Sequence, residues 1–228
     1  MIIPNNKKFL VYIKTAKTGG TSFIQILKQI SNNKVNYHTF EELEKNNQNI
    51  NIGDIILLVN DQINFFIKQF PQIYKDSYFI LISRDPLNRF ISGWKYHKIT
   101  KTKSIESLIN NPIYPNKKPY EIRWKKELPK KYWDSFSVYN HIYCGQTEAL
   151  VINGKFIIDY IIKFENYNEE MLIFFKHLKL TNNDIDKIVI PHKNNNNLNY
   201  FNIVSSISKE IKSEIYKMFK NDYNLLNY

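Results

Sequence analysis

The fold of this chain is restricted most by a repeated local pattern, in which a short apolar run ends abruptly in polar residues and a helical pattern follows. The first run, Phe9 to Ile13, has the length and continuity of a strand buried on both faces. From Ser22 onward, apolar side chains recur at the spacing of one helical face. Strand, turn and helix therefore form the opening unit.

Two more apolar runs, Asp54 to Asn60 and Tyr78 to Arg84, also end in polar residues, and a helix is expected over Arg89 to His97. Further elements are expected as a strand over Phe156 to Phe164, helices over Ser137 to Tyr143, Glu169 to Leu178 and Ile203 to Tyr223, and irregular segments over 100–135 and 190–200. Strands that alternate with helices predict an α/β fold with a central, mostly parallel sheet flanked by helices.

Length and composition predict one globular domain over residues 1–228, since 43% of the residues are hydrophobic. The net charge of +11 favours an anionic partner, although the lysines are scattered. Cys144 is the one cysteine, so an intrachain disulfide is excluded. Without a signal-peptide pattern or an apolar stretch of about 18 residues, we expect a soluble, cytoplasmic protein with no stable membrane insertion. The oligomeric state cannot be predicted.

The stretch KTAKTGGTS, residues 14–22, lies where the first strand ends and the first helix begins. Backbone N–H groups at a helix start attract anions, and Gly19 and Gly20 let the turn approach one closely. Thr21 and Ser22 add hydroxyl donors, and Lys17 adds a full positive charge. The pattern predicts a phosphate or sulfate site.

The stretch SRDPLNRFISGW supplies a second candidate anion site. Arg84 stands at a strand end, and Ser92 follows eight residues later on the next helix. A guanidinium can hold a phosphate through two hydrogen bonds, and a serine hydroxyl can add a third. We expect Arg89, in the same stretch, at the surface or paired with an acid.

Together, KTAKTGGTSF and ISRDPLNRFISGW resemble the two nucleotide motifs of the sulfotransferase superfamily. The resemblance covers most of the chain, because YNHIYCGQ, IIKFENYNEEM, IVIPHKNNNN and EIYKMFKNDYNLLNY are similar in kind and order to segments of the carbohydrate sulfotransferases. The resemblance extends to the heparan sulfate and uronyl 2-O-sulfotransferases and their bacterial relatives, and it implies a P-loop-like three-layer α/β fold. The implied reaction moves a sulfuryl group from 3′-phosphoadenosine 5′-phosphosulfate (PAPS) to an acceptor hydroxyl and releases 3′-phosphoadenosine 5′-phosphate (PAP).

The resemblance also implies a role for each matching residue. Lys17 would stabilise charge on the leaving phosphate, and Arg84 and Ser92 would bind the 3′-phosphate. The 5′ end would be bound by Thr18, Gly19, Gly20, Thr21 and Ser22. Lys193 could close over the nucleotide. A saccharide or another hydroxyl compound would be the acceptor, and neither a metal nor a nucleic acid is implied.

The general base departs from the family pattern. Many relatives place a histidine just after the second strand, where this chain reads LVNDQ and has Gln62. Asp61 and His38 are the candidates for the acceptor's proton, followed by His97 and His141. A chain with no dedicated base, or with no activity, stays open.

Two other functions stay open. The first is a P-loop kinase or NTPase. Its lysine follows the glycines, in the pattern G-x-x-x-x-G-K-[ST], whereas Lys17 precedes them here. Asp61, however, could imitate a magnesium-binding aspartate. The chain could also be an inactive nucleotide-binding relative. The acceptor cannot be identified, although the aromatic, lysine-rich segment from Tyr114 to Trp133 could line a glycan cleft.

Overall fold

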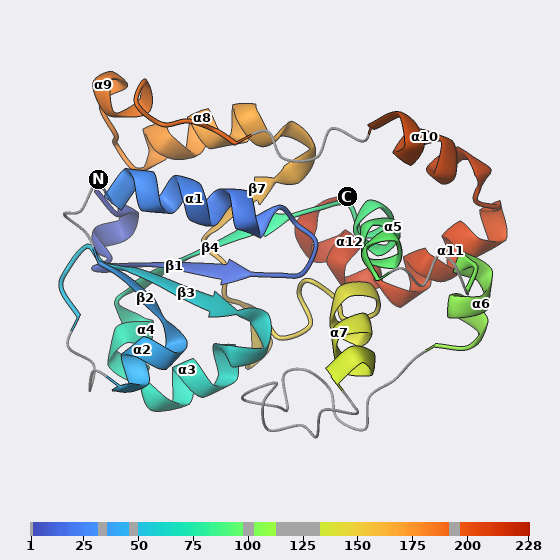
Figure 1. The fold of residues 1–228 in the computed structure, drawn as a ribbon. Helices are drawn as coiled ribbons and strands as arrows, with labels where there is room; N and C mark the ends of the chain where they lie inside the picture. Colours follow the sequence, from blue (N-terminus) through green and yellow to red (C-terminus); the bar gives the residue numbers. More distant parts are fainter. Residues whose placement is uncertain (1, 32–35, 46–49, 98–102, 113–132, 192–196) are drawn as a thin grey trace.

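The centre of the protein is a five-stranded sheet (Figure 1). The computed structural model describes residues 2–31, 36–45, 50–97, 103–112, 133–191 and 197–228. All neighbouring strands are parallel. In spatial order the strands are β2 (Tyr37–Thr39), β3 (Ile55–Val59), β1 (Phe9–Lys14), β4 (Ser77–Ser83) and β7 (Tyr160–Lys163).

Helices cover both faces of this sheet (Figure 1). One face carries α1 (Gly20–Ser31), α8 (Tyr167–His177) and α9 (Asn182–Ile185), and the other carries α2 (Phe40–Lys45), α3 (Ile63–Gln69) and α4 (Pro71–Lys75). Side chains of β1 enter the two cores alternately: Leu10 and Tyr12 pack on the α1 side, and Val11 and Ile13 on the other. The expected three-layer α/β fold is confirmed.

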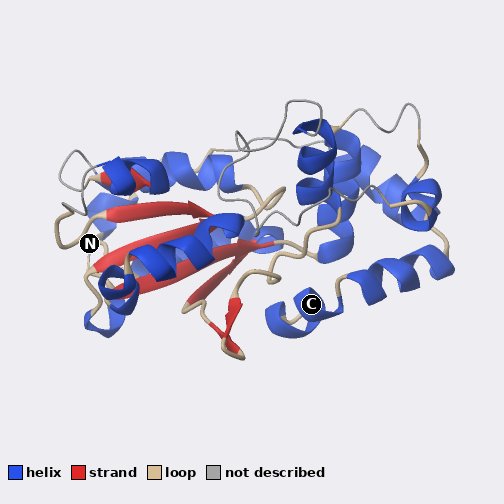
Figure 2. Ribbon diagram, turned by 90° about the horizontal axis from the view of Figure 1, so that it is seen from below, coloured by secondary structure: helices blue, strands red, loops and turns tan. Residues whose placement is uncertain are grey.

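A second group of helices lies beyond the end to which the strands point, as Figures 1 and 2 both show. It consists of α5 (Pro86–Tyr96), α6 (Ile105–Asn110), α7 (Trp133–Ile142), α10 (Asn197–Ser206), α11 (Lys209–Met218) and α12 (Lys220–Leu226). A separate core holds the group together, with Phe90, Ile142 and Phe219 buried in it. The carboxyl edge of the sheet therefore faces this helical group, and ligands of parallel sheets bind at such edges.

The helix α5 begins directly after the strand that delivers Arg84. The Asp85 carboxylate accepts a hydrogen bond from the Asn88 N–H at 2.8 Å, and Pro86 occupies the first turn. The cap ends β4 sharply, so Arg84 stays in the connection at the carboxyl edge.

Several local expectations are wrong. The segment 100–135, expected to be irregular, contains α6 and the start of α7, and α10 begins at Asn197 within the expected loop 190–200. The expected strand from Phe156 to Phe164 is instead two strands, β6 (Lys155–Phe156) and β7. Asn153 and Gly154 (φ 50° and 76°) form the turn of a small hairpin, which joins β5 (Val151–Ile152) to β6 before the chain reaches β7. The strand β2 was not expected. The expected last helix is three helices, and Ser208 caps the second by accepting from the Ile211 N–H at 3.3 Å. Arg89 is fully buried, with its guanidinium 4.9 Å over the Phe219 ring.

Short 3-10 turns complete the described elements: η1 (Pro4–Asn6), η2 (Asn60–Gln62) and η7 (Phe164–Asn166). Over the described ranges, no helix has both the length and the apolar character needed to cross a bilayer.

Candidate functional site

The loop between β1 and α1 holds most of the predicted anion-binding residues. Its conformation is unusual, because Lys17 has a φ of 65° and Gly19 a φ of 85°. Thr18 is buried under the loop, where its hydroxyl donates to the Thr15 carbonyl at 3.1 Å. In the first turn of α1, Thr21 is exposed and Ser22 is partly exposed. Thr18 therefore shapes the loop, while Thr21 and Ser22 remain accessible to a ligand.

Glycine is required at two positions of this loop. A Cβ atom on Gly19 would lie 2.5 Å from the Phe164 ring, and one on Gly20 would lie 2.6 Å from the Tyr12 hydroxyl. The positive φ of Gly19 adds strain for any other residue. The backbone of the loop therefore packs closely against the Phe164 ring and the Tyr12 hydroxyl at the start of α1. The first N–H groups of a helix have no partner within the helix.

Lys17 lies over an aromatic ring and beside a second cation. Its ammonium is 3.9 Å from the centre of the Tyr96 ring, at the end of α5. Burial, and then the positive charge of Arg84, lower the pKa of Lys17 to about 8. A bound anion would relieve both effects, so the environment of Lys17 suits a negatively charged ligand.

Arg84 joins the two predicted nucleotide motifs. Its Nη1 donates to the Lys17 carbonyl at 3.3 Å, and its guanidinium lies 4.7 Å over the Phe164 ring. Ser92 is partly exposed on α5, two turns beyond the start of that helix. Lys193 lies outside the described residues. The structure thus brings the loops of Lys17 and Arg84 into contact.

Asp61 lies in η2, directly beyond the carboxyl end of β3. In the register of the sheet, Lys14 stands opposite Val59, so Asp61 and Lys17 follow neighbouring strand ends. Among the described residues, no group hydrogen-bonds the buried Oδ1 of Asp61. Burial raises the pKa of Asp61 to about 7, and the charge of Lys17 does not contribute to the shift. The carboxyl is therefore tuned to exchange a proton near neutral pH.

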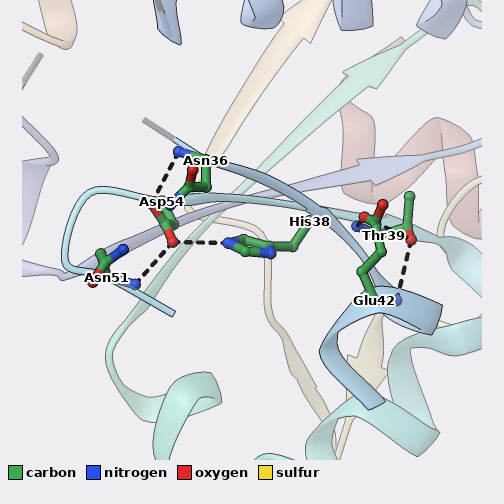
Figure 3. A network of polar contacts seen from close by, with 6 residues as sticks. All are labelled: Asn36, His38, Thr39, Glu42, Asn51 and Asp54. Carbon is green, nitrogen blue, oxygen red and sulfur yellow. Dashed lines mark hydrogen bonds and ion pairs between the residues drawn. The ribbon is translucent and has the colours of Figure 1, made fainter. Parts of the chain in front are cut away.

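The side chain of His38 points toward Asp54 (Figure 3), at the end of β3 away from Asp61. Its Nε2 lies 2.8 Å from Oδ2 of Asp54, which immediately precedes β3. Asp54 also accepts from the backbone N–H groups of Asn36 at 3.1 Å and Asn51 at 2.8 Å. His38 is therefore part of a buried network that fastens β2 to β3, and the structure does not bring it together with Lys17.

Gln62, at the position where the resemblance led us to expect a histidine, also has a structural contact. Its side-chain oxygen accepts from the Val59 N–H at 3.0 Å, and the residue is buried. This bond holds the turn that presents Asp61.

Two histidines lie close together beside Tyr96. His97 directly follows α5, and His141 belongs to α7. Nε2 of His97 lies 2.6 Å from Nδ1 of His141, and the Tyr96 ring is 5.1 Å from each imidazole. Tyr96 is also the ring under the Lys17 ammonium. Sequence reasoning ranked these histidines last, because their pairing depends on how α5 packs against α7.

A search for three or more metal-ligating side chains in one place finds no such group in the part of the chain that the structure describes. Residues 114–132, most of the segment that we expected near an acceptor, lie outside that part.

One comparison with known proteins, the match to a family model, agrees with the two motifs. The chain resembles a solved sulfotransferase from Alicyclobacillus acidocaldarius, with 13% identity, a TM-score of 0.43, and coverage of 96% of this chain and 93% of that one. No curated protein matches significantly. The model of the family described as "Sulfotransferase family" matches residues 1–228. The chain therefore belongs to the sulfotransferase family.

Proposed function

We propose that this protein, as a single domain over residues 1–228, transfers a sulfuryl group from PAPS to a hydroxyl group of a carbohydrate. The observation that carries the proposal is the contact between the two loops, in which Arg84 Nη1 donates to the Lys17 carbonyl at 3.3 Å. Two cations thus stand together at the carboxyl edge of a parallel sheet, where ligands of such sheets bind. A donor with phosphate groups at both its 5′ and 3′ ends matches this pair.

The residues of the first loop fit the 5′ end of such a donor. Gly19 and Gly20 let the loop backbone pack against the Phe164 ring and the Tyr12 hydroxyl, where a Cβ atom would clash. The backbone N–H groups at the start of α1 can then face an anion. Thr21 and Ser22 add hydroxyl donors at the accessible side. Thr18 holds the loop from below.

PAPS supplies the sulfuryl group and a phosphate leaving group. Lys17 stabilises the negative charge that develops on the leaving phosphate, and its effect is largest in the transition state. Arg84, with Ser92, holds the 3′-phosphate through charge-assisted hydrogen bonds. Lys193 stays a proposed contact with the nucleotide.

Asp61 is the proposed general base. The acceptor oxygen bonds to sulfur, the bond from sulfur to the leaving phosphate breaks, and the carboxylate of Asp61 takes the hydroxyl proton. A base works best with a pKa near the working pH, and the pKa of Asp61 is about 7. His38 is the weaker candidate, because Asp54 already holds its imidazole.

Calorimetric titration with PAP, ATP and ATP plus magnesium tests the donor site. We expect PAP to bind without magnesium and more tightly than ATP. A preference for magnesium–ATP would contradict the proposal and favour a kinase or NTPase. Transfer from PAPS to desulfated heparin and chondroitin chains tests the reaction itself, and binding of PAP without transfer to any acceptor would favour an inactive relative.

A further inference from the structure

We propose that Gln146 is a positioning residue, which aims the guanidinium of Arg84 at the 3′-phosphate and is itself held by Asp222 of α12. This inference rests on the proposed function, in which Arg84 binds that phosphate. It adds a residue far from both nucleotide motifs in the sequence.

The first step is the unusual position of the Arg84 backbone. The ladder between β4 and β7 ends with the pair Ser83 and Lys163, so the peptide groups of Arg84 lie just beyond it. Buried or half-buried peptide groups need other partners there. Gln146 provides both: its Oε1 accepts from the Arg84 N–H at 2.9 Å, and its Nε2 donates to the Arg84 carbonyl at 2.7 Å. A primary amide can donate and accept in this way, whereas a carboxylate cannot donate.

The second step is the support of Gln146 itself. Oδ2 of Asp222 accepts from the Gln146 N–H at 2.7 Å. Oδ1 of Asp222 accepts from the Thr147 N–H at 2.9 Å and from the Thr147 hydroxyl at 2.7 Å. Each of the three residues is only 1% exposed. Hydrogen bonds to a carboxylate are strong, so the loop after α7 is fastened firmly to α12.

The third step connects this support to the site. Arg84, whose backbone Gln146 holds, donates from Nη1 to the Lys17 carbonyl at 3.3 Å. A continuous set of hydrogen bonds therefore runs from α12 through Gln146 to Arg84 and on to the loop of Lys17. Figure 1 shows α12 beside α5, at the end of the sheet where both loops lie.

The consequence is specific to one part of the nucleotide. Loss of the Gln146 amide keeps the charge of Arg84 and the contacts of its guanidinium with the Lys17 carbonyl and the Phe164 ring, but it frees the Arg84 backbone, so the guanidinium is aimed less precisely. Affinity for a 3′-phosphate should fall, while affinity for the rest of the nucleotide should change less. A merely structural role would weaken the binding of both kinds of nucleotide alike.

The experiment measures one ratio by calorimetry: the Kd of adenosine 5′-phosphate divided by the Kd of PAP. Gln146→Leu removes both bonds to Arg84, and Gln146→Glu keeps the volume and the acceptor but removes the donor. Thr147→Val is the matched control, because Thr147 lies in the same loop, is equally buried, and bonds Asp222 but not Arg84. Arg84→Ala shows the ratio when the 3′ contact is absent.

We expect the ratio to fall by about tenfold or more in Gln146→Leu, since the loss of a hydrogen bond to a charged group weakens binding by about this factor. The ratio should fall by a smaller factor in Gln146→Glu. If Gln146→Leu does not fold, the ratio of Gln146→Glu alone tests the inference. Thr147→Val should lose stability and keep the wild-type ratio. Wild-type ratios in both folded Gln146 variants would overturn the inference alone. A wild-type protein with the same ratio as Arg84→Ala would overturn the proposed role of Arg84 and the inference with it.

Discussion

Replacement of Asp61 by asparagine should make the protein more stable at neutral pH and less active. The variant removes a carboxyl that is mostly buried, and whose buried Oδ1 has no hydrogen-bond partner among the described residues. Burial raises the pKa of this group from 3.8 to about 7 in the folded protein. Ionised Asp61 therefore opposes folding, because the unfolded chain releases the proton more easily.

The magnitude follows from the two pKa values. A rise from 3.8 to about 7 corresponds to about 4 kcal/mol of lost stability at high pH, at about 1.4 kcal/mol per pKa unit. The sign is clear: between these values the folded state holds more protons than the unfolded state, so wild-type stability falls as the pH rises. Below 3.8 the penalty is absent, and above about 7 it is complete.

Urea unfolding of both proteins, followed by tryptophan fluorescence, measures the effect. The stability of Asp61→Asn relative to wild type should increase by about 3 kcal/mol between about pH 5 and about pH 8. The fixed cost of burying the amide moves the whole curve but not its slope. Asp186→Asn, a change at an exposed aspartate, is the control. A stability difference that stays constant with pH would refute the reasoning about burial.

The same variant tests the proposed chemistry. With desulfated heparin or chondroitin as acceptor, loss of a general base should lower the turnover by about 10²–10⁴-fold. The wild-type kcat/KM should rise with pH, reach half of its limit near pH 7, where Asp61 is half ionised, and level off above that pH. Full turnover in Asp61→Asn would exclude Asp61 as the base and direct attention to the His97–His141 pair.

Three further outcomes are expected. Lys17→Ala should lower turnover by about 10²–10³-fold with the fold intact. Wild-type kcat/KM should decline above about pH 8, where Lys17 loses its proton. Activity that stays high at pH 10, about two units above that pKa, would contradict this role. Arg84→Ala should weaken the binding of PAP far more than that of adenosine 5′-phosphate, and equal losses in calorimetry would indicate a folding role. His38→Ala should lower the unfolding midpoint, because it leaves the buried carboxylate of Asp54 without one partner, but it should keep turnover; a stable variant without activity would return His38 to the site.

Much of the fold could be predicted because burial leaves a direct record in the sequence. The apolar runs at Phe9–Ile13, Asp54–Asn60 and Tyr78–Arg84 match β1, β3 and β4 to within one residue at each end, since strands buried on both faces are mostly apolar. Edge strands leave a weaker record, and the three residues of β2 have no such run. The Asn153-Gly154 pair was a signal that could have been used, because this dipeptide favours a tight hairpin turn.

The candidate site was predictable only where local geometry defines it. The glycines and Lys17 belong to one loop, so their sequence spacing already fixes their proximity. The bonds from Gln146 to Arg84 and between His97 and His141 join residues 62 and 44 positions apart. Such contacts depend on how helices pack beyond the sheet, and no short pattern encodes them. Arg89 was misjudged for the same reason, because the ring that covers its guanidinium belongs to Phe219.

Several features of the site oppose folding. A bound nucleotide would relieve two of them, the desolvation of the Lys17 ammonium and its repulsion from Arg84. Lys17 has a left-handed backbone conformation, which costs about 1 kcal/mol for a residue with a side chain. Its ammonium is partly desolvated and faces the positive charge of Arg84. The two phosphate groups of PAP, one beside each cation, would offset the repulsion and raise the pKa of Lys17, so the binding of PAP should be accompanied by proton uptake above pH 8. The raised pKa of Asp61 has a different origin, because burial is its main cause and a backbone hydrogen bond opposes the rise. Asp61 can therefore hold or release a proton near pH 7 beside the loop that carries Lys17.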